Sequence, residues 1–255
     1  MNQEKRAIQS SYGSECPVCY GTGWQIYTEH VEGYKEPIEF SKICPKCKGR
    51  RRMNDKTGIP PEYCNTDISK FDFSTYRTNM DPMKKIAMSF VNDFPKWQER
   101  GKGLYFWSNT PGSGKTFLSC CLARSLMIKY GLQMRFITAP FYIDAVRESI
   151  KRARGEEDRT KVYRECDVLV FDDIGAQSGG EWQGQEIFNL INNRMEEGKI
   201  TIYTSNVDVN ELNVGSRTRD RIVKTSIILR MPEEGLREKK AELEQQQFLQ
   251  MILQK

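Results

Sequence analysis

FWSNTPGSGKT, residues 106–116, gives the strongest indication of the fold. It ends in the tripeptide GKT, preceded by Gly112 and a serine. At the mouth of a helix, such a loop wraps a phosphate with successive backbone N–H groups, while its lysine reaches the phosphate oxygens and its hydroxyl binds Mg²⁺. We therefore interpret the stretch as the phosphate-binding loop (P-loop) of a nucleotide site. The alternative is a glycine-rich turn between core elements.

The first position of the loop departs from the pattern GxxxxGK[ST], because Asn109 stands where glycine is expected. That glycine mainly lets the chain turn sharply out of a strand, a role that can require positive φ, and asparagine adopts positive φ more readily than most residues. We therefore expect the loop to keep its function. The residues predicted to bind the nucleotide here are Asn109, Pro111, Gly112, Ser113, Gly114, Lys115, Thr116 and Phe117, with Lys115 also predicted to be catalytic.

Apolar segments around the P-loop predict a parallel α/β sheet flanked by helices. The run GLYFW before the loop suits a buried strand, and residues 116–131 after it have apolar side chains at helical spacing and a closing glycine. We also expect a helix near residues 82–98, strands at 133–138, 167–173 and 200–206, and helices at 141–155 and 182–197.

A second chemical signature is VLVFDDIG, residues 168–175. A buried strand that ends in two acids would place Asp172 beside Mg²⁺ together with Thr116. Asp173, one step further, would orient or deprotonate the attacking water. The alternative is that both acids merely form the turn after the strand.

Two cysteine pairs near the N-terminus, CPVCYGTG and CPKCKGRR, repeat one pattern. Their four thiolates, Cys16, Cys19, Cys44 and Cys47, predict a closed structural Zn²⁺ site. Residues 24–40 between the pairs have the pattern of a β-hairpin turning near Glu32-Gly33, so a small zinc-ribbon-like β module is expected. The alternatives are two disulfides or free thiols. His30 is expected at the surface.

Length and composition fit one good core plus a small appendage: 255 residues, 38% hydrophobic and 29% charged. We expect a zinc-binding domain at 1–53, a linker at 54–80 and an ATPase domain at 81–255. Neither a membrane span nor an apolar signal region is present, which predicts a cytoplasmic protein. A basic run at residues 42–52, without an acid, suits nucleic acid or an acidic partner, or is simply a solvated face.

In their order along the chain, SNTPGSGKT, DVLVFDDIGAQ, EWQGQEIFNLINNR, TIYTSN and SRTRDRI resemble the AAA+ ATPases of the DnaC/DnaI type, which load replicative helicases in bacteria. The residues GIPPEY ahead of FDF, and the paired cysteines, resemble the linker entry and the zinc-bearing members of that family. The resemblance implies an ATPase that uses ATP and Mg²⁺, binds single-stranded DNA and a hexameric replicative helicase, and self-associates through an arginine finger.

The resemblance also assigns roles to polar residues late in the chain. Asn206 would be the sensor of the attacking water or γ-phosphate, although a strand-ending turn residue is the alternative. Arg221 matches the arginine finger better than Arg217 does. Arg237 matches the second sensor arginine, with an exposed helix arginine as the alternative. Asp173 stands where many AAA+ proteins have glutamate, and the shorter acid predicts slow hydrolysis.

DNA contacts are expected on the helix FYIDAVRESIKRARG, through Arg147, Lys151, Arg152 and Arg154. The alternative is a solvated helix face. The N-terminal domain is expected to contact the helicase, chiefly through its apolar and aromatic residues. Competing functions are a transposase-helper ATPase, which shares this core, and a zinc-bearing helicase adaptor or inhibitor that does not hydrolyse ATP. A small-molecule kinase would leave TIYTSN and SRTRDRI without a purpose.

Overall fold

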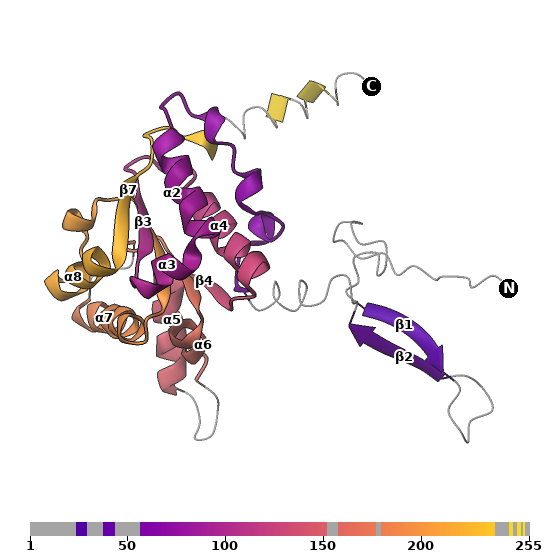
Figure 1. Ribbon diagram of the computed structural model, residues 1–255. Coiled ribbons are helices and arrows are strands. Elements are labelled where there is room, and N and C mark those ends of the chain that lie inside the picture. Colours follow the sequence, from indigo (N-terminus) through magenta and orange to yellow (C-terminus); the bar gives the residue numbers. More distant parts are fainter. Residues whose placement is uncertain are drawn as a thin grey trace. The chain divides into compact units, whose positions relative to one another are not determined.

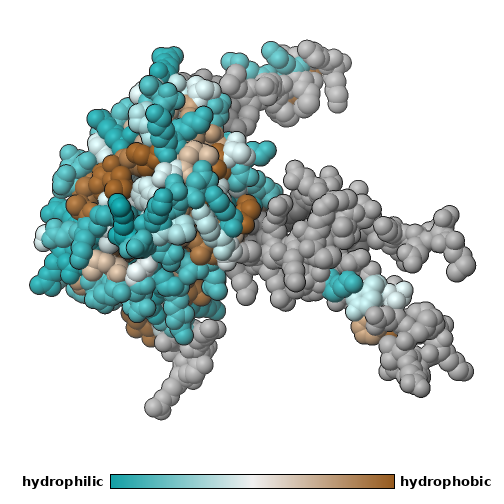
Figure 2. All heavy atoms as spheres, viewed as in Figure 1, coloured by the Kyte–Doolittle hydropathy of each residue, from teal (hydrophilic) through white to brown (hydrophobic). Residues whose placement is uncertain are grey.

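The computed structural model describes residues 24–29, 38–43, 57–151, 158–176, 180–237, 245–246, 249–250 and 252 (Figure 1). The chain divides into two compact units, Met1–Lys56 and Thr57–Lys255. Within the described residues, no helix is both long and apolar enough to cross a membrane. The visible, described surface of the second unit is largely hydrophilic, with a few hydrophobic groups (Figure 2).

The first unit contains one antiparallel strand pair, β1 (Trp24–Glu29) with β2 (Ile38–Ile43). Tyr27 lies opposite Phe40, and their ring centroids are 5.8 Å apart. The two strands agree with the expected hairpin, although the second one continues to Ile43. The remaining predictions for this unit fall outside the described residues: the turn near Glu32-Gly33, His30, and the cysteines Cys16, Cys19, Cys44 and Cys47.

The second unit is built on a five-stranded sheet in the order β4-β5-β6-β3-β7. Every neighbouring pair in it is parallel, which confirms the parallel α/β fold. The strands are β3 (Gly103–Trp107), β4 (Met134–Thr138), β5 (Val168–Asp172), β6 (Ile200–Ser205) and β7 (Ser226–Arg230). The three central strands are almost wholly buried, because helices cover both faces of a parallel sheet.

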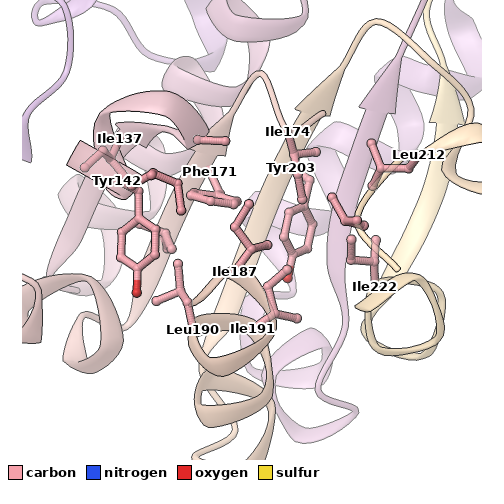
Figure 3. Close-up of a cluster of buried hydrophobic side chains, with 14 of the residues drawn as sticks. Ile137, Tyr142, Phe171, Ile174, Ile187, Leu190, Ile191, Tyr203, Leu212 and Ile222 are labelled. Atoms are coloured by element: carbon pink, nitrogen blue, oxygen red, sulfur yellow. The ribbon is translucent and has the colours of Figure 1, made fainter. Parts of the chain in front are cut away.

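One face of the sheet packs against α5 (Ala139–Lys151), α7 (Glu181–Glu196) and α8 (Ser216–Thr225), with α6 (Lys161–Glu165) beside α7 (Figure 1). Ile187, Leu190 and Ile191 of α7 pack there with Phe171 and Tyr203 of the sheet (Figure 3). Burial of these apolar side chains is the main favourable contribution to the stability of this layer.

The opposite face packs against α4 (Lys115–Tyr130), with α2 (Asp81–Asn92) and α3 (Phe94–Glu99) beside it (Figure 1). One helix was expected near residues 82–98, and that prediction is wrong. The helix breaks at Asp93 because Pro95 lies in the first turn of α3 and has no N–H to continue the hydrogen bonds of α2. The helix α4 agrees with prediction and ends at Gly131, whose φ is 71°.

The stretch from Thr57 to Met80 differs from the linker expected at residues 54–80, because it packs on α4 as part of the second unit. Arg124 donates to the carbonyl of Thr66 over 2.7 Å, and the Ser125 hydroxyl accepts from the Ile68 N–H over 2.9 Å. Its short helices are η1 (Pro61–Tyr63), η2 (Ile68–Lys70) and η3 (Phe73–Thr75). The glycine, prolines and polar residues of this stretch therefore belong to a structured segment that packs on α4.

Three regular elements of the second unit, α6, α8 and β7, were not expected from the sequence. The strand β7 follows α8 directly, so no turn residue marks its start, and its side chains are only partly buried. The short helix α6 has only five residues, too few for a periodic apolar pattern. The helix α8 contains the motif SRTRDRI, but its residues are mostly polar and give a weak apolar pattern.

Candidate functional site

The candidate site lies where the carboxyl ends of β3, β5 and β6 meet at one edge of the sheet. The P-loop connects β3 to α4, and β5 and β6 are direct neighbours in the strand order. In open parallel sheets, ligands bind at this edge, because the loops that follow the strands converge there. The strand order therefore brings together polar residues that are far apart in the sequence.

Glycine is required at two P-loop positions. Gly112 and Gly114 have φ of 72° and 92°, which L side chains rarely adopt. A Cβ on Gly114 would also lie 2.5 Å from the hydroxyl oxygen of Tyr76. Gly114 is the N-cap of α4 and has no side-chain capping bond, so the N–H groups of the first turn remain available to an anion.

Asn109 does not use the conformation expected for it. Among the described residues, only Asp173 combines a side chain with positive φ, so the turn at Asn109 needs no left-handed backbone. The Asn109 N–H instead donates to a carboxylate oxygen of Glu233 over 3.2 Å. The loop therefore does without the usual first glycine because its backbone needs no positive φ at this position. The predicted reason was different, namely that asparagine would adopt positive φ.

Lys115 lies inside the P-loop and is 7% exposed. Its ammonium group donates to the carbonyls of Ser108 and Thr110 over 3.2 and 3.3 Å, and to the Ser113 hydroxyl over 3.3 Å. Burial lowers the pKa of Lys115, while nearby carboxylates, Asp173 first among them, oppose that change. The P-loop thus surrounds the Lys115 ammonium group with oxygen acceptors. The phosphate oxygens of a bound nucleotide are expected to contact the same group.

Thr116 and Asp172, the predicted Mg²⁺ ligands, lie in direct contact. The Thr116 hydroxyl donates to Oδ1 of Asp172 over 2.9 Å, and the Thr204 hydroxyl donates to the same oxygen over 2.6 Å. Burial raises the pKa of Asp172, and these two hydrogen bonds oppose the rise. A hydroxyl and a carboxylate are hard oxygen ligands of the kind Mg²⁺ prefers, so this pair fits the ion.

Asp173 and Asn206 lie side by side, one step beyond β5 and β6. The Asn206 amide nitrogen donates to Oδ1 of Asp173 over 3.2 Å, and the Asp173 N–H donates to the Thr204 hydroxyl over 2.9 Å. The φ of 58° at Asp173 is an uncommon conformation for a residue with a side chain. Such a conformation persists only where surrounding contacts hold it, and here it places a partly exposed carboxylate at the site.

Arg237 lies against the P-loop through its backbone, and its role as a sensor stays a prediction. Its N–H donates to the carbonyl of Gly112 over 3.3 Å, next to a 3.0 Å bond from the Leu236 N–H to the same oxygen. Burial is the main cause that raises the pKa of Tyr63 to about 12, and Arg237 opposes that rise. The aromatic rings of Tyr63 and Phe117, the latter in the first turn of α4, pack with centroids 5.4 Å apart.

The two candidate finger arginines lie on α8. Arg221 donates to the Asn192 side chain over 3.3 Å and lies over the ring of Phe188 at 5.5 Å, both on α7. Arg217 is exposed and lines a cavity of about 360 Å³ between the N-terminal ends of α7 and α8. The preference for Arg221 over Arg217 stays a prediction.

On α5, Arg147 and Lys151 are exposed, as a DNA-contacting role requires. Arg147 pairs with Asp144 over 3.0 Å and lies over the ring of Trp182 at 5.7 Å. Phe141, on the same helix, is 69% exposed. Arg152 and Arg154 lie outside the described residues, where the expected end of this helix also falls.

Sequence reasoning missed three residues that hold the site together. Thr204 contacts both Asp172 and the Asp173 N–H, and its signal was its place two residues before Asn206 in the strand TIYTSN. Tyr76 donates to the carbonyl of Ser113 over 2.7 Å. Glu233 contacts the first turn of the P-loop. The local sequence carries no signal for Tyr76 or Glu233, because both come from segments distant in the chain.

The fold and these contacts define a P-loop ATPase of the AAA+ class. The family model for IstB-like ATP binding proteins matches residues 50–243, and the chain belongs to this family.

Two of its relatives are named replicative helicase loaders. DnaI of Bacillus subtilis (strain 168) is 27% identical over 71% of this chain and 58% of its own length. DnaC of Escherichia coli (strain K12) is 22% identical over 68% of this chain and 69% of its own length. The matched stretch therefore spans little more than half of DnaI.

Solved structures share the fold. The crystal structure of the DnaC helicase loader matches with a TM-score of 0.59 at 24% identity, over 68% of this chain and all of that one. AMPPCP-bound DnaA from Aquifex aeolicus matches with a TM-score of 0.56 at 20% identity, over 74% of this chain and 56% of that one. At these identities the likeness establishes the fold alone.

Proposed function

We propose that the protein is an ATP-dependent loader of a replicative DNA helicase, which places the helicase on single-stranded DNA as an ATP-switched oligomer. The observation that carries the proposal is the sequence similarity to two proteins named replicative helicase loaders, DnaI and DnaC. A site suited to ATP binding and hydrolysis supports it, because a loader needs an ATP-dependent switch.

The residues of the site would divide the work on ATP. The P-loop N–H groups and Lys115 bind the phosphates, and Thr116 and Asp172 hold Mg²⁺. When bound, Mg²⁺ neutralises charge on the phosphate oxygens. Asp173 and Asn206, already in contact, orient the attacking water.

A neighbouring subunit would complete this site. An arginine of its α8, Arg221 or Arg217, would approach the γ-phosphate and stabilise the negative charge of the transition state. Arg237 would act from within the same chain, since its backbone already contacts the P-loop. ATP hydrolysis would then depend on the assembly of neighbouring subunits. This dependence distinguishes an ATP-driven switch from an ATPase that acts as a single chain.

The helix α5 would contact single-stranded DNA. Arg147 and Lys151 supply exposed positive charge, and the exposed ring of Phe141 offers a surface on which a base can stack. Arg152 and Arg154 extend the same basic sequence.

The first unit would contact the helicase and bind one Zn²⁺ through Cys16, Cys19, Cys44 and Cys47. Trp24, which follows the first cysteine pair, lies opposite Ile43, which immediately precedes the second. The two strand ends nearest to the cysteine pairs in the sequence are therefore paired with each other. Four thiolates are a donor set that favours zinc. The exposed Phe40, stacked on Tyr27, offers apolar contact to a partner protein.

The zinc proposal has a direct test. Elemental analysis of protein purified without added metal should give one Zn²⁺ per chain. The double variant Cys16→Ser/Cys47→Ser should lose it, whereas Cys64→Ser, which alters a cysteine outside the two pairs, should keep it. Full zinc content in the double variant would refute the assignment.

A transposase-helper ATPase is the second candidate, and the match to the IstB-like family model favours it. A zinc-bearing adaptor or inhibitor that binds ATP without hydrolysing it is the third. The three functions differ in partner and in turnover, so one set of measurements separates them.

The deciding experiment mixes the protein with a hexameric replicative helicase, with and without ATP, and measures the mass of any complex. A loader gives an ATP-dependent complex and transfers the helicase to a single-stranded DNA circle, whereas Lys115→Ala does neither. A complex without hydrolysis or transfer would indicate the adaptor. No complex with the helicase, but stimulation of a transposase, would indicate the helper.

A further inference from the structure

Glu233, three residues after β7, binds the first turn of the P-loop. Its Oε2 accepts hydrogen bonds from the Thr110 N–H and hydroxyl, both over 2.8 Å, and from the Ser108 hydroxyl over 3.0 Å. Its Oε1 accepts from the Asn109 N–H over 3.2 Å. One carboxylate therefore holds three consecutive residues at the exit from β3.

The position of Glu233 is itself fixed. Arg230, the last residue of β7, donates to Oε1 of Glu233 over 3.1 Å and lies over the ring of Trp107 at 4.9 Å. Trp107 is the last residue of β3, and the two strand ends are paired in the sheet. The carboxylate therefore reaches the loop from an element that is rigidly attached to the strand before the loop.

The same loop residues also hold the P-loop lysine. Ser108 and Thr110, which Glu233 binds through their hydroxyls, accept from the ammonium group of Lys115 through their carbonyls. Displacement of this turn would therefore displace Lys115. Burial by itself would raise the pKa of Glu233, but the hydrogen bonds from Thr110, Ser108 and Asn109 outweigh it and lower the pKa to about 2, so the group is a carboxylate at neutral pH.

We propose that Glu233 is a positioning residue for ATP binding, which holds the 108–110 turn in the shape that a first glycine would otherwise give it. The proposal explains how Asn109 is accommodated without positive φ. Glu233 acts through the loop and does not touch the reacting atoms. It should therefore affect substrate and transition state equally, which changes affinity rather than the rate of the bound complex.

The test compares Glu233→Ala, Glu233→Gln and Glu233→Asp with Glu197→Ala, which removes an exposed glutamate at the end of α7. Titration with a fluorescent ATP analogue gives the affinity, steady-state hydrolysis gives KM and kcat, and thermal unfolding without nucleotide gives stability. We expect Glu233→Ala to weaken affinity and raise KM by about tenfold, with kcat within about twofold of the parent, since a charge-assisted bond to the loop is lost.

Glu233→Asp should recover part of the affinity, and Glu197→Ala should match the parent. Unchanged or tighter ATP binding in Glu233→Ala would overturn the proposal, as would a fall in kcat at unchanged KM. If Glu233→Ala does not fold, Glu233→Gln decides, because it keeps the size and one acceptor oxygen: parental affinity in that variant would equally overturn the proposal.

Discussion

At the residue scale, the site depends on a few hydroxyls and amides that connect the chemical groups. The Thr204 hydroxyl donates to Asp172 and accepts from the Asp173 N–H, so one side chain of β6 sets the geometry of both acids at the end of β5. Asn206 then fixes the Asp173 carboxylate. The two acids consequently have different surroundings, one buried beside Thr116 and the other partly exposed.

These surroundings predict separable effects of two substitutions. Lys115→Ala should abolish ATP binding, because it removes the cation that the P-loop encloses. Asp173→Asn should keep binding and lose most hydrolysis, on the order of a hundredfold or more, because an amide cannot take a proton from water. Equilibrium titration and single-turnover hydrolysis measure the two effects. Equal loss of binding in both variants would contradict the division of roles.

At the element scale, helices are tied to each other by polar side chains as well as by the apolar core. Asp158 accepts hydrogen bonds from Ser149 of α5 and from Thr160 and Arg164 around α6. Burial by itself would raise the pKa of Asp158, but these bonds outweigh it and hold the pKa well below its usual value of 3.8. This carboxylate therefore joins two helices that the sheet alone does not connect.

The sign of that pKa change predicts a pH dependence of stability. A carboxylate whose pKa is lowered by folding stabilises the protein above its unfolded pKa, and the contribution is lost as the pH falls through the folded pKa. Asp158→Asn should therefore lower the free energy of unfolding at pH 7 and have a shrinking effect below about pH 4. Urea unfolding at several pH values measures this, and a deficit that does not shrink in acid would contradict it.

The basic face of α5 carries its own prediction. Arg147→Ala/Lys151→Ala should weaken binding of a labelled oligo-dT and reduce the salt dependence of that binding, because phosphate contacts release counterions. The matched control is Lys84→Ala/Lys85→Ala, which removes the same charge from exposed positions of α2. Fluorescence anisotropy at two salt concentrations measures both, and equal effects of the two pairs would favour the solvated helix face.

At the scale of the whole molecule, the P-loop and the residues that contact it belong to the second unit, which begins at Thr57. The segment from Thr57 to Met80 belongs to that site, because Tyr76 bonds to the Ser113 carbonyl and Glu234 accepts from the N–H groups of Arg77 and Thr78. A cut within this segment would expose α4. The useful boundary therefore lies before Thr57.

A chain that begins at Thr57 should remain folded and bind ATP, yet lose its association with the helicase. The physical reason is that the first unit, with its own strand pair, is the proposed partner surface, while the contacts of the P-loop come from the second. Mass measurement with helicase and ATP checks the association, and ATP titration of the shortened chain is the control. Helicase binding at undiminished affinity would place the partner surface on the ATPase unit.

The local chemistry can be read from the amino-acid sequence alone: the GKT loop, the paired acids after an apolar strand, and the alternation of strands and helices. Each of these follows from neighbouring residues, since a buried strand needs an apolar run and a phosphate loop needs glycines at fixed offsets. The strands β3 to β6 and the parallel class of the sheet were accordingly predictable. The break between α2 and α3 was readable from Pro95 but was not predicted.

Which distant residues join the site depends on the tertiary structure. Glu233 reaches Thr110 across 123 positions of the chain, and Tyr76 reaches Ser113 across 37. Neither contact leaves a local pattern, because it depends on β7 lying beside β3 and on the 57–80 segment folding back over α4. Asn109 shows the consequence: its residue type suggested a left-handed turn, whereas the Glu233 carboxylate, from the segment after β7, holds the loop without one.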